Sequence, residues 1–422
     1  MKTEATALPL APPVSRRFPR AARVGFFERQ LRAGLDRLEH GGLELAGPTG
    51  RSHHGRRDGL QARVEVHDAR FFRAVALRGS VGAGEAWASG WWTSPDPVAV
   101  VRLFVRNRAA LARLEGGLAH LARPVLAVAH ALRRNTRLGS RANIAAHYDL
   151  SNEFFALFLD ETMTYSCGLF PHPGASLREA SLAKIERLCD RLELTERDHL
   201  LEIGTGWGAF ALHAARRHGC RVTTTTISRR QHGLARARVA GARLADRVEV
   251  LLQDYRDLGG TYDKLVSIEM IEAVGHAYYP TFFRRCAELL RPDGRMALQA
   301  ITIADELYDD GRRSVDFIQT HIFPGSCIPS VTALLSAATR ASDLRLERLE
   351  EIGPHYVATL AVWRRNLRLR WSAAKALGFS EELLRAWEFY FAYCEGGYAE
   401  GQLGNVHMLF ARPAARALPD PA

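Results

Sequence analysis

Residues 200–210 read LLEIGTGWGAF and decide the expected fold, because three glycines join a short apolar run to the start of a helical pattern. Gly204, Gly206 and Gly208 allow a tight turn, a close approach of the backbone to a ligand, and amide groups presented at a helix N-terminus. The spacing differs from the G-x-G-x-x-G of dinucleotide-binding folds, although the context is the same. The stretch predicts a nucleoside-binding loop, with a turn that serves topology alone as the alternative.

Strands and helices are expected to alternate on both sides of this loop. Helical patterns such as GAFALHAARRHG separate the early members of a series of short apolar or β-branched runs, namely HLLEIG, CRVTTTTIS, RVEVLLQD, YDKLVSIEM and GRMALQAITI. This alternation predicts an α/β fold with a doubly wound, mainly parallel sheet and helices on both faces. We expect residues 330–410 to be mostly helical.

The first third of the chain differs in charge from the rest. Residues 1–141 hold 24 Lys and Arg against 11 Asp and Glu, a net charge of +13, whereas the remainder holds 33 against 35, a net charge of −2. Basic surfaces of this kind often meet nucleic acid or an anionic membrane. We expect four parts, in chain order: a disordered basic tail over 1–23, a smaller, mostly helical domain over 24–132, a basic linker over 133–141 and the α/β domain over 142–412.

The elements of the first domain follow from local patterns. We expect helices over 25–41 and 97–114, and a strand at ARVEVHD (62–68). The segment GEAWASGWWTSPDP (84–97) is interpreted as rich in turns and carries three tryptophans, Trp87, Trp91 and Trp92.

Several classes of protein are disfavoured. No run approaches the roughly 18 apolar residues of a membrane-spanning helix, and the first residues lack the apolar stretch of a signal peptide. The six cysteines form no C-x-x-C pair, which argues against a zinc ribbon and a disulfide framework. We expect a cytoplasmic protein with reduced thiols and no metal site.

Polar residues follow the second and third expected strands of the α/β domain. The second strand lacks the usual acidic residue for ribose hydroxyls, so Thr226 and Gln231, with the adjoining Ile227, are the candidates for that contact. Asp254 and Tyr255 would face an adenine through one carboxylate and one ring. The alternatives are an exposed helix start after the strand and, for Asp254, a helix or turn cap.

Two carboxylates stand in the apolar text VSIEMIEAVG (266–275). Glu269 and Glu272 lie three residues apart and would share a face of a helix. Carboxylates in apolar surroundings are costly unless they have partners, which favours a functional site over a solvated surface. In contrast, the aromatic set near the end is expected to be core rather than an acyl tunnel; its members are Tyr390, Phe391, Tyr393 and Tyr398.

Several segments, in colinear order, resemble the cyclopropane fatty acid synthases, a family that includes the mycolic acid methyltransferases. They are HYDLSNEFFALFLDETMTYSCGLF (147–170), LEIGTGWGAF, TISRRQ, DYRDL, YDKLVSIEMIEAVGHAYY and FIQTHIFPGSCIPS, with GSVGAGEAWASGWW in the first domain. The resemblance implies a class I methyltransferase with a Rossmann-like, seven-stranded sheet and S-adenosylmethionine as cofactor. It implies transfer of the methyl carbon to the cis double bond of a phospholipid acyl chain.

The resemblance also assigns residues to the cofactor. Glu202 would support the glycine loop, which passes under the amino-acid end of S-adenosylmethionine. Tyr165 and Ser166 would touch the methionine end, with a polar loop packed on the sheet as the alternative.

The base implied by the resemblance is a bound bicarbonate. Its contacts would be Cys167, Glu272 and Tyr356, with Ile301 offering a backbone group. Gln299 stands where the family has a histidine, and glutamine donates a neutral hydrogen bond but exchanges no proton. This departure leaves open whether the product is a ring, a methyl branch or a methylene. For Cys167 the alternative is a buried, inert thiol.

Phospholipid substrates imply a membrane partner. The basic first domain and its three tryptophans suit peripheral docking on the inner face of the cell membrane, and the resemblance implies a homodimer. The alternative is an Arg-rich solvated surface with tryptophans packed in the core. An RNA methyltransferase and a non-catalytic lipid-binding protein are the competing functions; no RNA-binding signature is present, so we expect no nucleic-acid partner.

Overall fold

The structure is a computed structural model that describes residues 24–115 and 151–415. The tail predicted over 1–23 and the linker predicted over 133–141 lie outside these residues. The described part of the first domain holds fourteen basic against ten acidic residues, whereas segments 1–23 and 116–141 together hold ten against one. Most of the positive excess therefore belongs to residues outside the described part of the first domain.

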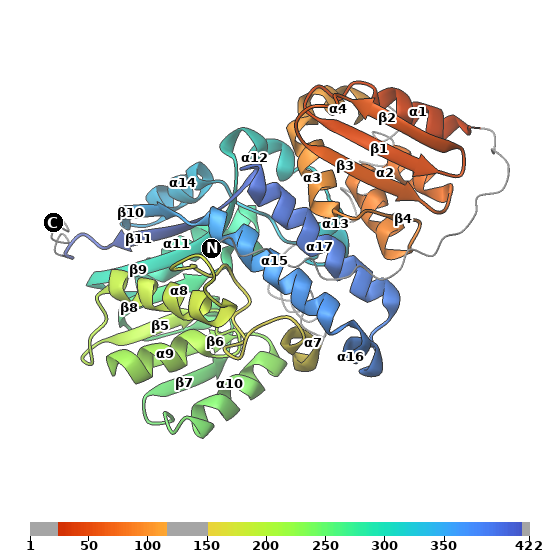
Figure 1. The fold of residues 1–422 in the computed structure, drawn as a ribbon. Helices are drawn as coiled ribbons and strands as arrows, with labels where there is room; N and C mark the ends of the chain where they lie inside the picture. Colours follow the sequence, from red (N-terminus) through yellow and green to blue (C-terminus); the bar gives the residue numbers. More distant parts are fainter. Residues whose placement is uncertain (1–23, 116–150, 416–422) are drawn as a thin grey trace.

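The N-terminal domain is mostly helical, as predicted, but it also contains a four-stranded sheet of order β2-β1-β3-β4 (Figure 1). The sequence pattern had indicated only β3. Strands β1 and β3 pair in parallel, and β2 and β4 pair antiparallel at the edges. The elements are α1 (Phe26–Leu35), β1 (Gly42–Gly47), β2 (Gly50–Gly55), β3 (Gln61–Val66), α2 (Arg70–Ala88), β4 (Trp92–Thr93), α3 (Pro97–Arg106) and α4 (Arg108–Glu115).

Two of the three tryptophans of this domain are packed inside the protein, which corrects the expectation that Trp87 and Trp92 meet a membrane. Trp87 and Trp92 are each 3% exposed, and both rings lie 6.1 Å from the ring of Phe389. Trp91 is partly buried, and the Arg70 guanidinium lies 4.4 Å from its ring centre. The segment 84–97 is also less turn-rich than predicted, because α2 continues through residue 88.

The second domain is built on a seven-stranded sheet of order β10-β11-β9-β8-β5-β6-β7, which confirms the predicted doubly wound fold. The pairs β5–β6, β6–β7, β5–β8 and β8–β9 are parallel, and β11 is antiparallel to both neighbours. The strands are β5 (His199–Ile203), β6 (Arg221–Thr226), β7 (Val248–Leu252), β8 (Tyr262–Ile268), β9 (Leu290–Ile303), β10 (Arg345–Glu351) and β11 (Leu403–Ala411).

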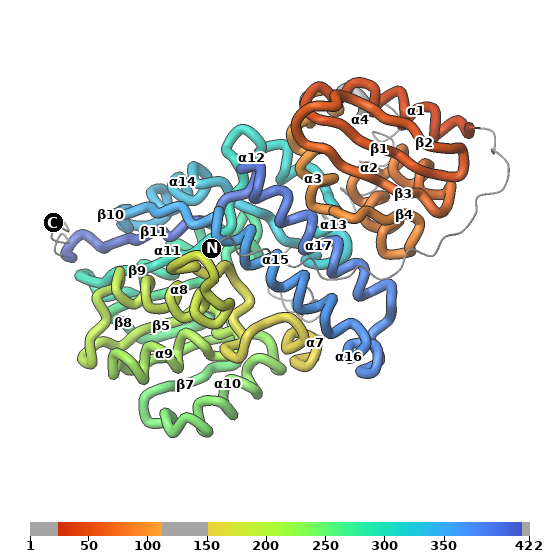
Figure 2. The backbone as a smooth tube through the Cα atoms, in the orientation of Figure 1, coloured from red at the N-terminus to blue at the C-terminus, as the bar shows by residue number. Residues whose placement is uncertain are grey.

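Residues 330–410 are mostly helical, as expected, but the region also contains two strands, β10 and β11, which the sequence pattern did not indicate. In Figure 2 the dark blue β11 lies beside the teal β9, so the end of the chain completes the sheet. The reason is that LGNVHMLFA is a short apolar run, and periodicity alone does not separate a buried strand from a buried helix.

Helices cover the sheet and connect it to the N-terminal domain (Figure 1). Helices α15 and α17 pack on each other, and α17 also packs on α2 and α3. The helices of this part are α7 (Asn152–Ala156), α8 (Leu177–Leu192), α9 (Ala209–His218), α10 (Arg229–Gly241), α11 (Tyr279–Leu289), α12 (Asp305–Gly311), α13 (Phe317–His321), α14 (Val331–Ala341), α15 (Gly353–Leu369), α16 (Trp371–Ala376) and α17 (Glu381–Ala399), with short 3-10 turns η2 (Tyr255–Asp257), η3 (Ile271–Ala273) and η4 (His276–Tyr278).

Close packing joins the two domains. A Cβ added at Gly396 of α17 would lie 2.6 Å from Val101 of α3. The Glu400 carboxylate, just after α17, accepts hydrogen bonds from Arg102 at 2.6 Å and from Arg106 at 2.7 Å. The N-terminal domain is thereby held against α17 of the second domain.

Candidate active site

A cavity of about 390 Å³ opens at the carboxyl ends of the central strands. Strand order reverses here, with β6 on one side of β5 and β8 on the other, which is where open α/β sheets bind ligands. The cavity is lined by these predicted site residues: Tyr165, Ser166, Glu202, Gly204, Gly206, Thr226, Ile227, Gln231, Asp254, Tyr255, Glu272, Ile301 and Tyr356. Cys167, Gly208 and Gln299 lie behind the lining.

The glycine loop adopts a backbone that requires glycine. Gly204, Gly206 and Gly208 have φ angles of +104°, +53° and +87°, which residues with a Cβ rarely adopt. A Cβ at Gly204 or Gly208 would lie 3.4 Å from a neighbouring side chain, whereas one at Gly206 would meet no atom within 4 Å. Gly206 therefore faces the open space of the cavity, where a nucleoside would lie.

A buried carboxyl supports this loop, in the place that the resemblance implied. Glu202 is 3% exposed and accepts a hydrogen bond from the Thr224 hydroxyl at 2.6 Å. That hydroxyl lies 2.7 Å from the hydroxyl of Thr205 inside the loop. Burial raises the pKa of Glu202 to about 8, so the side chain is largely protonated at neutral pH.

Glu202→Gln should make the stability of the protein depend less on pH in the range between about 4.3 and about 8. The folded protein binds a proton on Glu202 up to about pH 8, whereas the unfolded carboxyl loses it near a pKa of about 4.3. Stability of the natural protein therefore falls as pH rises through this window. We expect the glutamine variant to gain about 4 kcal/mol relative to the natural protein between the two ends of the window, as measured by urea denaturation. If the difference in stability between the variant and the natural protein stayed the same across this pH range, the raised pKa of Glu202 would be contradicted.

The residues expected to face the ribose and the adenine lie in the cavity but also bind each other. The Thr226 hydroxyl donates to the Gln231 side-chain oxygen at 2.9 Å. Asp254 accepts the backbone NH of Arg256, as the capping alternative proposed, and also accepts both arms of the Arg256 guanidinium at 2.8 and 2.7 Å. Arg256, which the sequence did not single out, orients the Asp254 carboxylate.

A buried lysine is a site residue that the sequence pattern did not reveal. Lys184 of α8 is 1% exposed and donates a hydrogen bond to the Ser166 hydroxyl at 2.8 Å. Burial lowers its pKa to about 8, against the opposing charges of Glu269 and Glu202. Tyr165 lies on the apolar side, with its hydroxyl 3.1 Å from that of Tyr390.

Glu269 is the centre of the polar network, because groups from four segments donate to its carboxylate. Oε1 accepts the backbone NH of Cys167 at 3.0 Å, Gln299 Nε2 at 2.8 Å and Asn405 Nδ2 at 2.7 Å. Oε2 accepts the Tyr356 hydroxyl at 2.8 Å.

Glu269 and Glu272 do not share a helical face, which corrects that expectation. Strand β8 ends at Ile268, Glu269 has a left-handed φ of +46°, and Glu272 lies in η3. Glu272 Oε1 accepts the backbone NH of Ile301 at 2.5 Å, whereas Oε2 is buried without a hydrogen-bond partner among the described residues. Burial and the charge of Glu269 raise the pKa of Glu272 to about 8.

Gln299 is oriented by a residue behind it. His407 Nε2 lies 3.1 Å from Gln299 Oε1, and burial lowers the pKa of His407 to about 3, so this ring is neutral. A neutral ring that donates to Oε1 turns the Gln299 NH₂ group toward Glu269.

The Cys167 thiol points away from the cavity, so the expected contact of its sulfur with an anion is wrong. Its Sγ donates to the backbone oxygens of Gly168 at 3.3 Å and Ile352 at 3.8 Å. Burial raises the pKa of this thiol well above its ordinary value. The contribution of Cys167 to the site is its backbone NH.

The other half of the cavity is apolar, and the aromatic set contributes more to it than predicted. Tyr390, Tyr393 and Tyr398 line it, whereas Phe391 is buried in the core. Val101 and Val105 of α3 complete this wall, so the N-terminal domain takes part in the site.

Residues 136–408 match the family described as mycolic acid cyclopropane synthetase. The chain belongs to this family. It is 40% identical over 339 residues to tuberculostearic acid methyltransferase UfaA1 from Mycobacterium tuberculosis, covering 78% of each chain. It is 32% identical to the cyclopropane-fatty-acyl-phospholipid synthase of Escherichia coli (strain K12), covering 85% of this chain and 90% of that one.

Solved structures of the mycolic acid cyclopropane synthetase family agree with the fold. Cyclopropane synthase MmaA2 from Mycobacterium tuberculosis is 31% identical, with a TM-score of 0.61, and covers 64% of this chain and 98% of its own. Mycolic acid cyclopropane synthase CmaA1, complexed with SAH and CTAB, is 33% identical, with the same TM-score and coverage. This member of the family is an S-adenosylmethionine-dependent methyltransferase.

Bicarbonate, which the resemblance implied as the base, does not fit the residues of this family member. Of the residues expected to hold it, Gln299 and Tyr356 donate to Glu269 through their side chains, and Cys167 donates to Glu269 through its backbone NH. A second anion there would lose these donors and meet the charge of a carboxylate. No step of the reaction is therefore assigned to bicarbonate.

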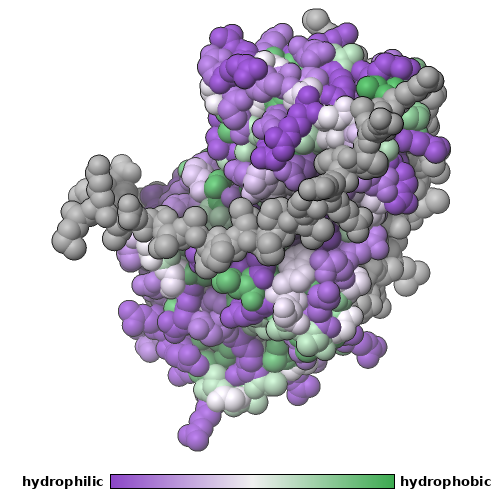
Figure 3. Space-filling view, turned by 45° about the vertical axis from the view of Figure 1, so that its right-hand side comes forward, coloured by the Kyte–Doolittle hydropathy of each residue, from purple (hydrophilic) through white to green (hydrophobic). Residues whose placement is uncertain are grey.

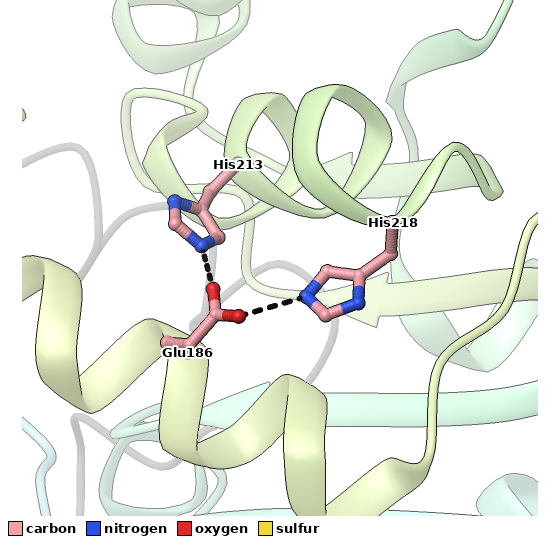
Figure 4. A group of neighbouring side chains, drawn as sticks. All are labelled: Glu186, His213 and His218. Carbon is pink, nitrogen blue, oxygen red and sulfur yellow. Dashed lines mark hydrogen bonds and ion pairs between the residues drawn. The ribbon is translucent and has the colours of Figure 1, made fainter.

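A second group of titratable side chains lies away from the cavity. In Figure 4 the Glu186 carboxylate of α8 lies between the rings of His213 and His218, the latter being the last residue of α9. One carboxylate oxygen hydrogen-bonds His213, and the other lies 3.5 Å from His218 Nε2. Burial opposes ionisation of Glu186, but the two histidines outweigh it and lower its pKa. These ion pairs account for the cluster.

Proposed function

We propose that this enzyme transfers the methyl carbon of S-adenosylmethionine to the cis double bond of a phospholipid acyl chain. The observation that carries the proposal is one cavity in which a glycine loop, the carboxylates of Glu269 and Glu272 and an apolar wall meet. The names of the relatives support it, since two of them are a tuberculostearic acid methyltransferase and a cyclopropane-fatty-acyl-phospholipid synthase.

The cofactor half of the cavity suits S-adenosylmethionine. The space in front of Gly206 admits the cofactor, and Ser166 and Lys184 offer polar groups beside it. Thr226, Gln231 and Asp254 would reach the nucleoside. When bound, S-adenosylmethionine supplies an electrophilic methyl group on a positively charged sulfur.

The acyl half suits an alkene, which is a poor nucleophile. Such a substrate needs a dry pocket, correct placement and a base for the proton that leaves, rather than an activated hydroxyl or amine. Leu360, Tyr390 and Val105 provide apolar walls, and the paired carboxylates lie in the same cavity. Loss of a proton from the transferred carbon would close a cyclopropane directly, or would give a methylene after a 1,2-hydride shift has moved the cation to the methylated carbon, whereas a saturated methyl branch requires an added hydride.

A labelling assay tests the proposed function. The purified full chain is incubated with methyl-labelled cofactor and vesicles of phosphatidylglycerol with cis-monounsaturated chains; vesicles with saturated chains and RNA serve as controls. We expect label only in the unsaturated lipid, with mass spectrometry showing one added methylene unit and fragmentation identifying the product. Label in RNA, or no label in any substrate despite cofactor binding, would contradict the function and favour one of the two competing proposals.

We further propose that the enzyme docks on anionic membranes through charge. No helix among the described residues is long and apolar enough to cross a bilayer. Hydrophilic residues dominate the described part of the face shown in Figure 3. Each Lys or Arg near an anionic leaflet contributes about 1 kcal/mol to the free energy of membrane binding. Product formation on vesicles should therefore fall as salt rises while cofactor affinity stays constant.

The homodimer implied by the resemblance is also a proposal, which light scattering would test.

A further inference from the structure

The Glu269 carboxylate is held by four hydrogen-bond donors at the edge of the reaction cavity. It accepts four hydrogen bonds of 2.7–3.0 Å, and its donors come from the loop before α8, from β9, from α15 and from β11. Three of the four bonds end on Oε1, so Oε2, which receives only Tyr356, keeps a lone pair. Glu269 also lines the cavity itself.

The backbone at Glu269 is an unusual one for glutamate. Its φ of +46° lies in the left-handed region, which residues with a side chain adopt at a cost of about 1–2 kcal/mol. Strain of this kind persists where the surrounding structure fixes it and is concentrated at functional sites. The conformation turns the chain out of β8 and brings the carboxylate to its four donors.

We propose that Glu269 is the catalytic base of the reaction and takes the place of a bound anion. This inference rests on the proposed function. The alkene electron pair forms a bond to the methyl carbon as the carbon–sulfur bond breaks, which leaves a carbocation on the acyl chain. Glu269 Oε2 then takes a proton from the transferred methyl carbon, and the electrons of that carbon–hydrogen bond close the ring.

The charges around Glu269 suit this role. A carbocation is strongly acidic, so the base needs correct placement more than a high pKa. The negative carboxylate also stabilises the positive charge that develops on the acyl chain. Burial and the neighbouring charge raise the pKa of Glu272 to about 8. Glu272 is therefore largely protonated at neutral pH, whereas Glu269 is the carboxylate that receives the four hydrogen bonds.

Glu269→Gly tests the proposal because it removes the carboxylate and suits the left-handed backbone. The four donors then surround a space for a small anion. In bicarbonate-free buffer we expect turnover on lipid vesicles to fall by about 10²–10⁴, the usual contribution of a general base. Formate or bicarbonate should restore at least about tenfold of this loss. The natural enzyme should be indifferent to both anions.

Anion binding gives a measurement that does not depend on activity. Labelled ¹³C-bicarbonate followed by NMR should bind Glu269→Gly and not the natural enzyme. Glu269→Gln is the second variant, because it keeps the size of the side chain; it should lose turnover to a similar extent without rescue by anions. Glu272→Gln is the control for the neighbouring carboxyl and should show no anion rescue. Binding of S-adenosylhomocysteine should persist in all three variants.

Two results would overturn the proposal. One is a natural enzyme whose turnover falls when bicarbonate is removed and returns when it is added. The other is a Glu269→Gly or Glu269→Gln variant with full turnover in bicarbonate-free buffer. Failure of the proposed function is distinguishable from both, because the natural enzyme would then modify no lipid while the anion-binding measurement still reports on the Glu269 position.

Discussion

Gly206→Leu should weaken the binding of S-adenosylmethionine by about a hundredfold or more, which corresponds to about 2.7 kcal/mol. A Cβ at this position meets no protein atom within 4 Å, so the new side chain would project into the cavity instead of clashing with the fold. It would occupy the space that the cofactor needs. Titration calorimetry with S-adenosylmethionine measures the effect.

Gly378→Leu is the matched control for this variant. Gly378 also has a positive φ, of +90°, with no atom within 4 Å of an added Cβ, and it is exposed after α16. Both substitutions carry a similar backbone strain, so their melting temperatures should fall alike while only Gly206→Leu loses affinity. Equal cofactor affinities in the two variants would show that the ligand does not lie against Gly206.

Trp387→Ala should lower the free energy of unfolding by about 3–5 kcal/mol, the usual cost of removing a large buried aromatic side chain. Trp387 of α17 is 1% exposed. Its ring lies 4.9 Å from Phe154 of α7, 5.6 Å from Phe158 and 5.5 Å from Tyr390. The loss is large against a typical domain stability of about 5–15 kcal/mol. Urea denaturation followed by circular dichroism measures it.

A surface substitution controls for this effect. Leu377 is 53% exposed at the end of α16, so Leu377→Ala should change stability by less than about 0.5 kcal/mol. Because Trp387 packs beside Tyr165 and Tyr390, its loss should also loosen the aromatic wall of the cavity. A destabilisation of Trp387→Ala no larger than that of the control would show that α17 is not anchored by this ring.

The cofactor half of the site could be predicted from the sequence because its signals are local. Gly204, Gly206 and Gly208 follow a short apolar strand directly, and each requires a backbone that only glycine adopts readily. Glu202 is part of the same stretch. The strands β10 and β11 were missed for the opposite reason, since β11 pairs with β9 across about a hundred residues of chain and β10 pairs only with β11.

The sequence by itself determined the α/β architecture, the glycine loop and the presence of carboxylates in apolar text, because strand–helix alternation and glycine chemistry act over a few residues. Only the tertiary structure decided which carboxylate receives the four hydrogen bonds. The partners of Glu269 lie 30 to 136 residues away along the chain, and a hydrogen bond forms only where folding brings donor and acceptor within about 3 Å. The resemblance implied an added anion as the partner of Gln299 and Tyr356, and the fold directs both side chains to Glu269.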